Sequence, residues 1–252
     1  MSLKKIVQKL EGKGFWLLIV LFCAVLFVGI LLFFYFNFFN SPDVSNKVST
    51  SENGKVISLA EIEKENAQLE ELIYNRQSVR SYKDQEISFK NISKILWSTI
   101  GTTVDGLSGP TRAAPSAGAT DPLEIFLLAQ NIKDLEAGIY HYHPEEHHLV
   151  RKIEGLKIDL LTEAALNQEA VVNAAAVVII TADYSRTTER YGDRGRKYVH
   201  LEAGHAAQNV NLMAEKLDLG SVNIGAFKDE EITSLIGEVD YQPLLLIPVA
   251  AP

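Results

Sequence analysis

The sequence predicts an α+β domain, a central mixed sheet flanked by helices, preceded by one N-terminal transmembrane helix. Three observations carry this prediction. Short apolar runs typical of buried strands are interleaved with segments in which apolar residues recur at helical spacing. One stretch alternates polar and apolar residues around a turn, which indicates an antiparallel hairpin. The first forty residues contain a long run without any charge.

The uncharged run covers residues 15–39, FWLLIVLFCAVLFVGILLFFYFNFF. At about 1.5 Å per residue, a helix of this length exceeds the roughly 30 Å hydrocarbon core of a bilayer. A removable signal peptide is the alternative, but its apolar region is usually shorter and is followed by small residues. Four lysines precede the run. The positive-inside rule then places segment 1–14 in the cytoplasm and the large domain on the outer side of the membrane.

Composition limits the function of the remainder. Residues 40–60 are polar and contain Pro and Gly, so we expect a tether before a single domain at 61–252. The chain has a net charge of −8, and within that domain acidic residues outnumber basic residues. A general nucleic-acid binder is therefore excluded. The only cysteine, Cys23, lies in the predicted span, which leaves the domain without thiolate chemistry.

The first elements of the domain are helices and a loop. Residues 61–75 and 88–101 have apolar side chains at helical spacing. In the second segment Ser88 is a candidate N-cap, and Gly101 ends the helix. Residues 111–122, TRAAPSAGATDP, are mostly small and favour neither helix nor strand. They form either a plain surface loop or a loop kept small so that a flat ligand can lie against its backbone.

The later elements supply the sheet. The run LEIFLLAQ, 123–130, predicts a buried strand, and GIYHYHPEEHHLVRKI, 138–153, predicts a hairpin. Further strands are expected in AAAVVIITA, SVNIGAF and PLLLIPVA. The longest helix should run from Arg194 to Leu217, and Gly220 should prevent it from continuing. Along one side of it we expect Tyr198, Leu201, His205, Leu212 and Met213.

Three charged residues or hydroxyls stand at alternate positions after the first helix. Arg76, Ser78 and Arg80 would point the same way in extended backbone. Two guanidinium groups and a hydroxyl suit a phosphate, because Arg offers paired planar donors and stays protonated. The alternative is an ordinary solvated loop.

Histidines and acids elsewhere are weaker signals. His141 and His143 share one face of the hairpin, but the adjacent His147 and His148 must point in opposite directions. No carboxylate or cysteine pattern specifies zinc, so we predict no metal site. Glu202 and His205 stand one turn apart on the longest helix. Such a pair is either a satisfied core network or a support behind a ligand site.

Five motifs in this order resemble the flavin-dependent nitroreductase superfamily, and within it the SagB/thiazole-oxidase-like dehydrogenase branch. They are R-x-S-x-R, PSAGA-x-x-P-x-E, GIYHYHPEEHHL, YGDRGRKYVHLEAGHAAQNV, and GAF followed by PLLLIPV. Together they span residues 74–249, which is nearly the whole predicted domain.

The resemblance implies a nitroreductase-like fold that forms a homodimer with FMN at the subunit interface. Hydride would pass through flavin N5, with NAD(P)H as a candidate electron donor. Arg76, Ser78 and Arg80 would hold the phosphate and the polar ring edge. The remaining cofactor residues it implies are Pro115, Ser116, Ala117 and Gly118, reaching the flavin from the partner subunit, Gly225 and Ala226 beside the ring, and Gln168, which would touch the cofactor.

Three departures from the family pattern stand out. Ala119 replaces an Asn that is common in this loop, and no basic residue follows the last strand. Azoline-oxidising relatives use a Lys–Tyr pair, for which this chain has Arg190 and Tyr191 as candidate catalytic residues. An Arg stays protonated and cannot act as a general base.

The sequence thus predicts a membrane-anchored, FMN-dependent oxidoreductase acting on a small molecule or a peptide, without nucleic acid. Two alternatives remain. One is an azoline (thiazoline or oxazoline) dehydrogenase in peptide modification. The other is a non-catalytic flavin-binding interaction module.

Overall fold

The computed structural model describes residues 25–26, 28–29, 68–106, 109–155 and 158–252. The chain divides into two units, Met1–Ile62 and Glu63–Pro252, and the fold below is that of the second. The predicted tether and nearly all of the predicted span lie outside the described residues.

One expectation from the sequence needs correction. In the part of the chain that the structure describes, no helix is long and apolar enough to cross a bilayer. The predicted localisation, a single-pass membrane protein with its domain on the outer side, is contradicted by this finding. We do not carry it further.

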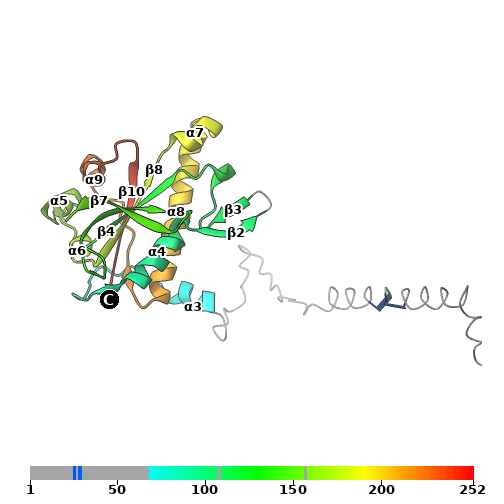
Figure 1. Ribbon diagram of the computed structural model, residues 1–252, viewed down its shortest axis with the longest axis horizontal. Helices are drawn as coiled ribbons and strands as arrows, with labels where there is room; N and C mark the ends of the chain where they lie inside the picture. The colour runs from blue at the N-terminus through cyan, green and yellow to red at the C-terminus, as the bar shows by residue number, and fades with distance from the viewer. Residues whose placement is uncertain (1–24, 27, 30–67, 107–108, 156–157) are drawn as a thin grey trace, which may run out of the picture. The chain divides into compact units, whose positions relative to one another are not determined.

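A six-stranded sheet forms the centre of the domain (Figure 1). Every ladder between its neighbouring strands is antiparallel. At one edge a parallel bridge joins Ser78 to Ser221, so the sheet is mixed, as predicted. In spatial order the strands are β7 (His148–Glu154), β6 (Gly138–His143), β4 (Leu123–Ala129), β8 (Ala176–Ala182), β10 (Gln242–Ala250) and β9 (Gly220–Ser221).

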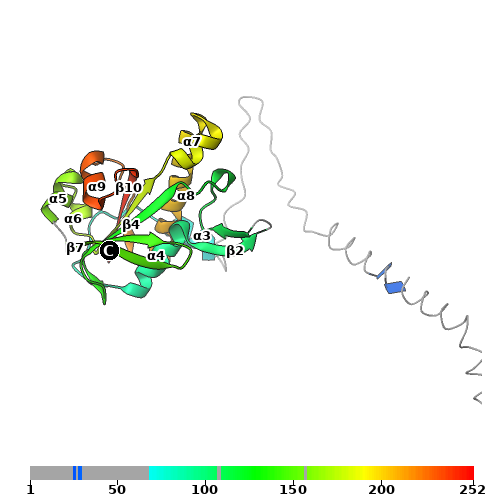
Figure 2. The ribbon, with the colours of Figure 1, turned by 45° about the horizontal axis from the view of Figure 1, so that its top comes forward.

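Helices cover both faces of this sheet. Successive side chains of a strand point to opposite faces, so Ile125 and Leu127 of β4 enter one core while Phe126 and Leu128 enter the other. The first core is completed by α4 (Phe89–Ile100) and α8 (Arg194–Lys216). The second is completed by α5 (Ile158–Ala164), α6 (Glu169–Val172) and α9 (Asp229–Ile236), which lie together on the other side in Figures 1 and 2. The predicted α+β class is confirmed.

Smaller elements surround the sheet. The short strand β1 (Ile87–Ser88) pairs in parallel with β5 (Ile132–Lys133), and β2 (Thr102–Gly106) pairs with β3 (Gly109–Arg112). The other elements are α3 (Gln68–Asn75), which contacts α8, the 3-10 turn η1 (Ala117–Ala119) and α7 (Ser185–Tyr191).

Local chemistry sets several boundaries where the sequence predicts them. The Ser88 hydroxyl accepts a hydrogen bond from the Asn91 N–H at 3.2 Å and so caps α4, and Gly101 ends that helix. The hairpin of β6 and β7 pairs Tyr142 with Leu149, as its alternating pattern predicts. By contrast, the SVNIGAF segment contributes only the end of β9 and two isolated bridges, Ser78 to Ser221 and Ile224 to Leu246.

The buried side of α8 differs from the prediction. Leu201 is 49 % exposed and His205 is also exposed, so the predicted apolar side is wrong. The buried side consists mainly of alanines with Val199 and Val210. Small side chains let the helix backbone approach the sheet closely, and that face carries little hydrophobic signal in the sequence.

Candidate functional site

The small-residue loop forms a turn whose outer side is exposed. Gly118 has φ of 62° and Ala119 has φ of 52°, both in the left-handed region. Pro115, Gly118 and Ala119 are exposed, while Ser116 and Ala117 are half-buried. The outer side of the loop is therefore exposed to solvent, and its inner side is packed against the domain.

The two predicted catalytic residues lie against this loop within the same chain. Arg190 Nη1 donates a hydrogen bond to the Gly118 carbonyl at 2.8 Å. A Cβ at Gly118 would lie 2.3 Å from Tyr191 Oη and 2.8 Å from Arg190 Nη1. Glycine suits this position, because both the left-handed backbone and the close approach of α7 disfavour a Cβ. Arg190 thus holds backbone rather than pointing into open space.

A second group of predicted residues gathers at the β9 edge of the sheet. The Val79 N–H donates to the Ser221 carbonyl at 3.0 Å, which fixes the Arg76–Arg80 segment alongside β9. Four residues after Ser221 the chain reaches Gly225 and Ala226, both exposed. The structure therefore brings the predicted phosphate residues and the predicted ring residues to one edge.

Gln168 belongs to this second group. It precedes α6, and its Nε2 donates to the Ala226 carbonyl at 2.6 Å and to the Ala165 carbonyl at 2.9 Å. The side chain thereby fixes the backbone on which a ring would lie. The expected contact between Gln168 and the cofactor stays a prediction.

A cavity of about 650 Å³ opens beside Gly225. Tyr184 and His200 line it, and Tyr184 Oη lies 2.7 Å from His200 Nε2. The guanidinium of Arg196 lies 5.0 Å from the centre of the Tyr184 ring. Burial raises the pKa of Tyr184 above its usual value. Sequence reasoning did not select these residues, although His200 opens the HLEAGH stretch.

The residues at the β9 edge fit an FMN molecule. Arg76 and Arg80 offer charge-assisted donors for a phosphate. A Cβ built on Gly225 would meet only Leu245, at 4.0 Å, so a flat ring can approach that backbone. The adjacent cavity leaves room for a second reactant.

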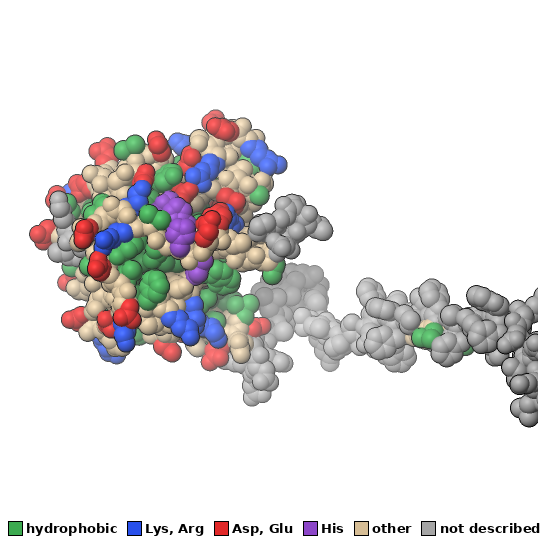
Figure 3. Space-filling view, viewed as in Figure 1, with side chains coloured by type: hydrophobic (Ala, Val, Ile, Leu, Met, Phe, Trp, Pro, Cys, Tyr) green, Lys and Arg blue, Asp and Glu red, His purple; other side chains and the backbone are tan. Residues whose placement is uncertain are grey.

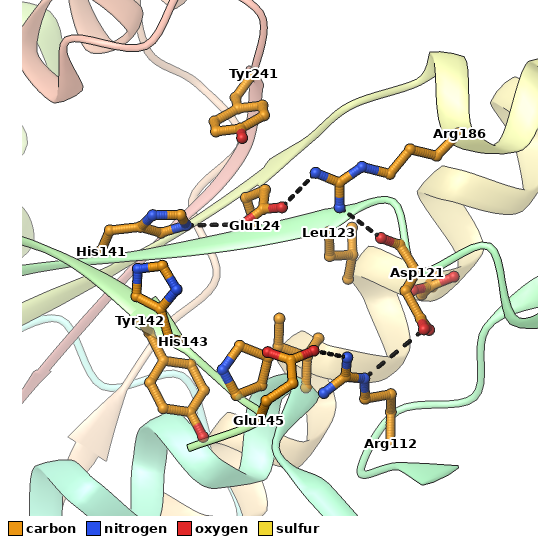
Figure 4. A pocket seen from close by; sticks show the side chains of 13 residues that line it. Arg112, Asp121, Leu123, Glu124, His141, Tyr142, His143, Glu145, Arg186 and Tyr241 are labelled. Carbon is orange, nitrogen blue, oxygen red and sulfur yellow. Dashed lines mark hydrogen bonds and ion pairs between the residues drawn. The ribbon is translucent and has the colours of Figure 1, made fainter. Parts of the chain in front are cut away.

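A charged pocket of about 280 Å³ lies elsewhere, between β4, β6 and α7 (Figure 4). Glu124 is at its centre, 2.7 Å from His141 Nε2 and 2.6 Å from Arg186 Nη2. Burial alone would raise the pKa of Glu124, but the hydrogen bonds from His141 and Arg186 outweigh it and lower the pKa below its usual value. Across the pocket Arg112 pairs with Glu145 and lies 3.8 Å from Asp121. Sequence reasoning assigned Glu124 no role of its own, although it closes the PSAGA-x-x-P-x-E motif.

Three of the four hairpin histidines contact one another as well as other groups, and histidine side chains gather on the face shown in Figure 3. His141 stacks on Phe126 with ring centres 4.6 Å apart, and His143 stacks on His148 at 4.8 Å. His147 lies between Tyr142 Oη and a serine hydroxyl of α4. Within the described residues, no group of three or more His, Cys, Asp or Glu could hold a metal ion. The absence of a metal in this protein stays a prediction.

Comparison with known proteins identifies the family. The model of the Nitroreductase family matches residues 73–251. The chain belongs to the nitroreductase family. It is 44 % identical over 193 residues to the "Putative nitroreductase" of Methanocaldococcus jannaschii, covering 77 % of this chain and 94 % of that relative.

Solved structures show the same fold. The microcin synthetase McbBCD complex of E. coli with truncated pro-MccB17 bound matches with a TM-score of 0.62 and 19 % identity, covering 86 % of this chain and 80 % of that chain. A putative nitroreductase from Desulfovibrio desulfuricans in complex with FMN matches with a TM-score of 0.52 and 19 % identity, covering 73 % and 86 %. Membership of this family implies a flavin-dependent oxidoreductase.

Proposed function

We propose that this protein is an FMN-dependent oxidoreductase that works as a homodimer with FMN at the subunit interface. The observation that carries the proposal is the β9 edge, where the Arg76–Arg80 segment is joined to Ser221, four residues before Gly225. One side of this edge suits a phosphate and the other suits a flat ring. FMN supplies hydride transfer at its N5 atom when it is bound.

The protein's own residues hold the cofactor and orient the substrate. Arg76, Ser78 and Arg80 would bind the phosphate and the polar ring edge, and Gln168 keeps the Ala226 carbonyl turned toward itself. The Tyr184 hydroxyl, hydrogen-bonded to His200, can hold or pass a proton at Oη beside a substrate in the adjoining cavity. NAD(P)H is a candidate electron donor for the same cavity.

The dimer is supported by the outer face of α8. Leu201 is half exposed, and a Cβ at Gly204 would meet nothing within 4 Å. His205 is exposed on the same stretch of helix. A helix that presents Leu and Gly to solvent offers a surface against which a second helix can pack closely. In such a dimer the bare outer side of the partner's 115–119 loop would meet the flavin.

The test of the cofactor assignment uses FMN affinity. Arg76→Ala and Arg80→Ala each remove a charge-assisted contact of about 1.5–3 kcal/mol, equivalent to roughly ten- to more than a hundredfold in Kd. The matched control is Arg151→Ala, which removes an exposed arginine of β7 that pairs with Glu136. FMN titrations followed by flavin fluorescence give the Kd values. Full flavin occupancy in the Arg76→Ala/Arg80→Ala double variant would contradict the assignment.

A SagB-type azoline dehydrogenase is the second candidate function. It is supported by the order of the five motifs and by the fold shared with the microcin synthetase complex. Against it stands Arg190, which cannot accept a proton and instead holds the Gly118 carbonyl. Incubation with a thiazoline-containing peptide and mass spectrometry would detect the loss of two hydrogens. A bound flavin that no donor reduces would favour the third candidate, a non-catalytic flavin-binding module.

A further inference from the structure

Glu202 is a buried carboxyl that the proposed function does not use. It lies on α8 and is 4 % exposed, whereas Leu201 and His205 on the same helix face outward. Among the residues that the structure describes, no other acidic or basic side chain is buried to this degree. Burying a charge is costly unless it is hydrogen-bonded, so the partners of Glu202 are informative.

Those partners belong to the small-residue loop. The Ser116 hydroxyl and the Ala117 N–H both donate hydrogen bonds to the Glu202 carboxyl. Ser116 Oγ in turn accepts a hydrogen bond from the Asp121 N–H at 2.9 Å. Two donors from consecutive residues fix both the Ser116 side chain and the peptide plane that follows it. Glu202 therefore holds the inner side of the loop.

The opposite side of the loop is held independently. Arg190 binds the Gly118 carbonyl, and Thr120 Oγ1 donates to the Ala117 carbonyl at 3.1 Å. Pro115 remains exposed, and so does Gly118, although its Cα faces α7. Glu202 is the group beneath the loop whose hydrogen bonding can change with pH.

We propose that Glu202 is a positioning residue for the 115–119 loop, and that its protonation state sets how firmly the loop is held. This inference rests on the proposed function, because the loop is the surface that a flavin would meet. It adds a residue that neither touches the cofactor nor takes part in the reaction.

Burial raises the pKa of Glu202 to about 7, and Asp121 adds to this effect while the hydrogen bond from Ser116 opposes it. The closed loop contributes to that burial. The closed state therefore binds the proton more tightly than an open state in which water reaches the carboxyl. By linkage, loop closure is strongest below the usual glutamate pKa of about 4.5, weakens as the pH rises from there toward about 7, and levels off above it. The other charged or titratable groups that line the shared pocket are Arg112, Glu124, His141, Tyr142, His143, Glu145, Arg186 and Tyr241.

Two substitutions at Glu202 separate the effect of its charge from the effect of its contact with the loop. Glu202→Gln is uncharged at every pH, and its carbonyl oxygen still accepts from the loop, so it mimics the protonated form. Glu202→Ala removes the contact at every pH. Glu215→Gln is the matched control, because it removes a carboxyl from the same helix outside the loop contact. Wild type and these three variants are titrated with FMN at pH 6 and pH 8.5.

We expect wild type to bind FMN more weakly than Glu202→Gln already at pH 6, because an open loop leaves the carboxyl ionised at that pH. Between pH 6 and pH 8.5 the ratio of the wild-type Kd to that of Glu202→Gln should rise further, by up to about tenfold, which is what one proton with a pKa of about 7 allows. Titration of the FMN phosphate is common to both proteins and cancels in this ratio. Glu202→Ala should bind more weakly at both pH values, and Glu215→Gln should follow wild type. A ratio that stays constant between pH 6 and pH 8.5 overturns the inference.

A second measurement is made without FMN. Hydrogen exchange of the peptide that covers residues 112–122 should be faster in wild type than in Glu202→Gln at both pH values, and the difference should be larger at pH 8.5. If FMN binds no form of the protein, the proposed function fails while this arm still tests Glu202. If FMN binds but loop exchange is the same in all four proteins, the proposed function stands and the role of Glu202 is refuted.

Discussion

Replacing Gly118 with alanine tests whether α7 really closes on the loop. A Cβ there would lie 2.3 Å from Tyr191 Oη and 2.9 Å from Arg190 Cζ, which is closer than such atoms approach. Both contacts are with the ends of side chains. The side chains can therefore move away, at the cost of the bonds that they now make.

The expected cost has two parts. An alanine at φ of 62° costs about 1–2 kcal/mol, because its Cβ crowds the following carbonyl in the left-handed region. Displacing Arg190 loses its hydrogen bond to the Gly118 carbonyl, which adds about 1 kcal/mol. Gly118→Ala should therefore lower the free energy of unfolding by about 2–3 kcal/mol.

The assay is urea unfolding with linear extrapolation. Gly237→Ala is the matched control, since Gly237 has φ of 76° and a Cβ there would meet nothing within 4 Å. It should cost only the backbone part, about 1–2 kcal/mol. In an Arg190→Ala/Tyr191→Phe background, Gly118→Ala should fall to the same value. If Gly118→Ala costs no more than Gly237→Ala in the wild-type background, the close approach of α7 is wrong.

Two further substitutions test the charged pocket around Glu124 and the hydrogen bond from Gln168 to Ala226. Glu124→Gln should lower the free energy of unfolding at pH 7 by about 1–3 kcal/mol through weakened contacts with His141 and Arg186. Because the pKa of Glu124 is lowered, its stabilisation is present above the usual value of 4.5 and is lost as the pH falls through the lower folded value. Thermal melts should therefore converge in acid, and a constant difference down to the lowest pH would contradict this pairing. Gln168→Ala should weaken FMN binding about three- to tenfold by freeing the Ala226 carbonyl, with little change in melting temperature. Unchanged affinity in a flavin titration would show that this hydrogen bond does not shape the ring site.

Much of the fold follows from local sequence chemistry. The Ser88 cap, the turn of the hairpin and the apolar strand runs each depend on residues close together in the chain, and the structure has them where the sequence predicts them. The buried face of α8 could not be found in this way. Hydrophobic periodicity gives weight to large residues such as Leu201, whereas packing against the sheet selects alanine.

The candidate site was predictable in part for a similar reason. The family motifs indicated the two groups of residues, but their mutual contacts depend on the topology of the sheet. Glu202 meets Ser116, and Gln168 meets Ala226, across long separations in sequence. Neither contact leaves a signal in local spacing. The predicted membrane localisation rested on hydropathy of the first forty residues and had no support from the described helices.

The complete burial of β8 has a consequence for how the sheet assembles. All seven of its residues are buried, and nearly all of them are apolar. A slip of one residue against β4 would still bury apolar side chains, so hydrophobicity alone does not specify the pairing. Thr181 favours the observed pairing over the slipped one, because its hydroxyl donates a hydrogen bond to the Glu124 carbonyl at 3.0 Å. The side chain of Glu124 is itself tied to α7 by Arg186. The polar cluster at the end of β4 therefore also sets the alignment of the central strands, and its loss should slow folding through misaligned pairings.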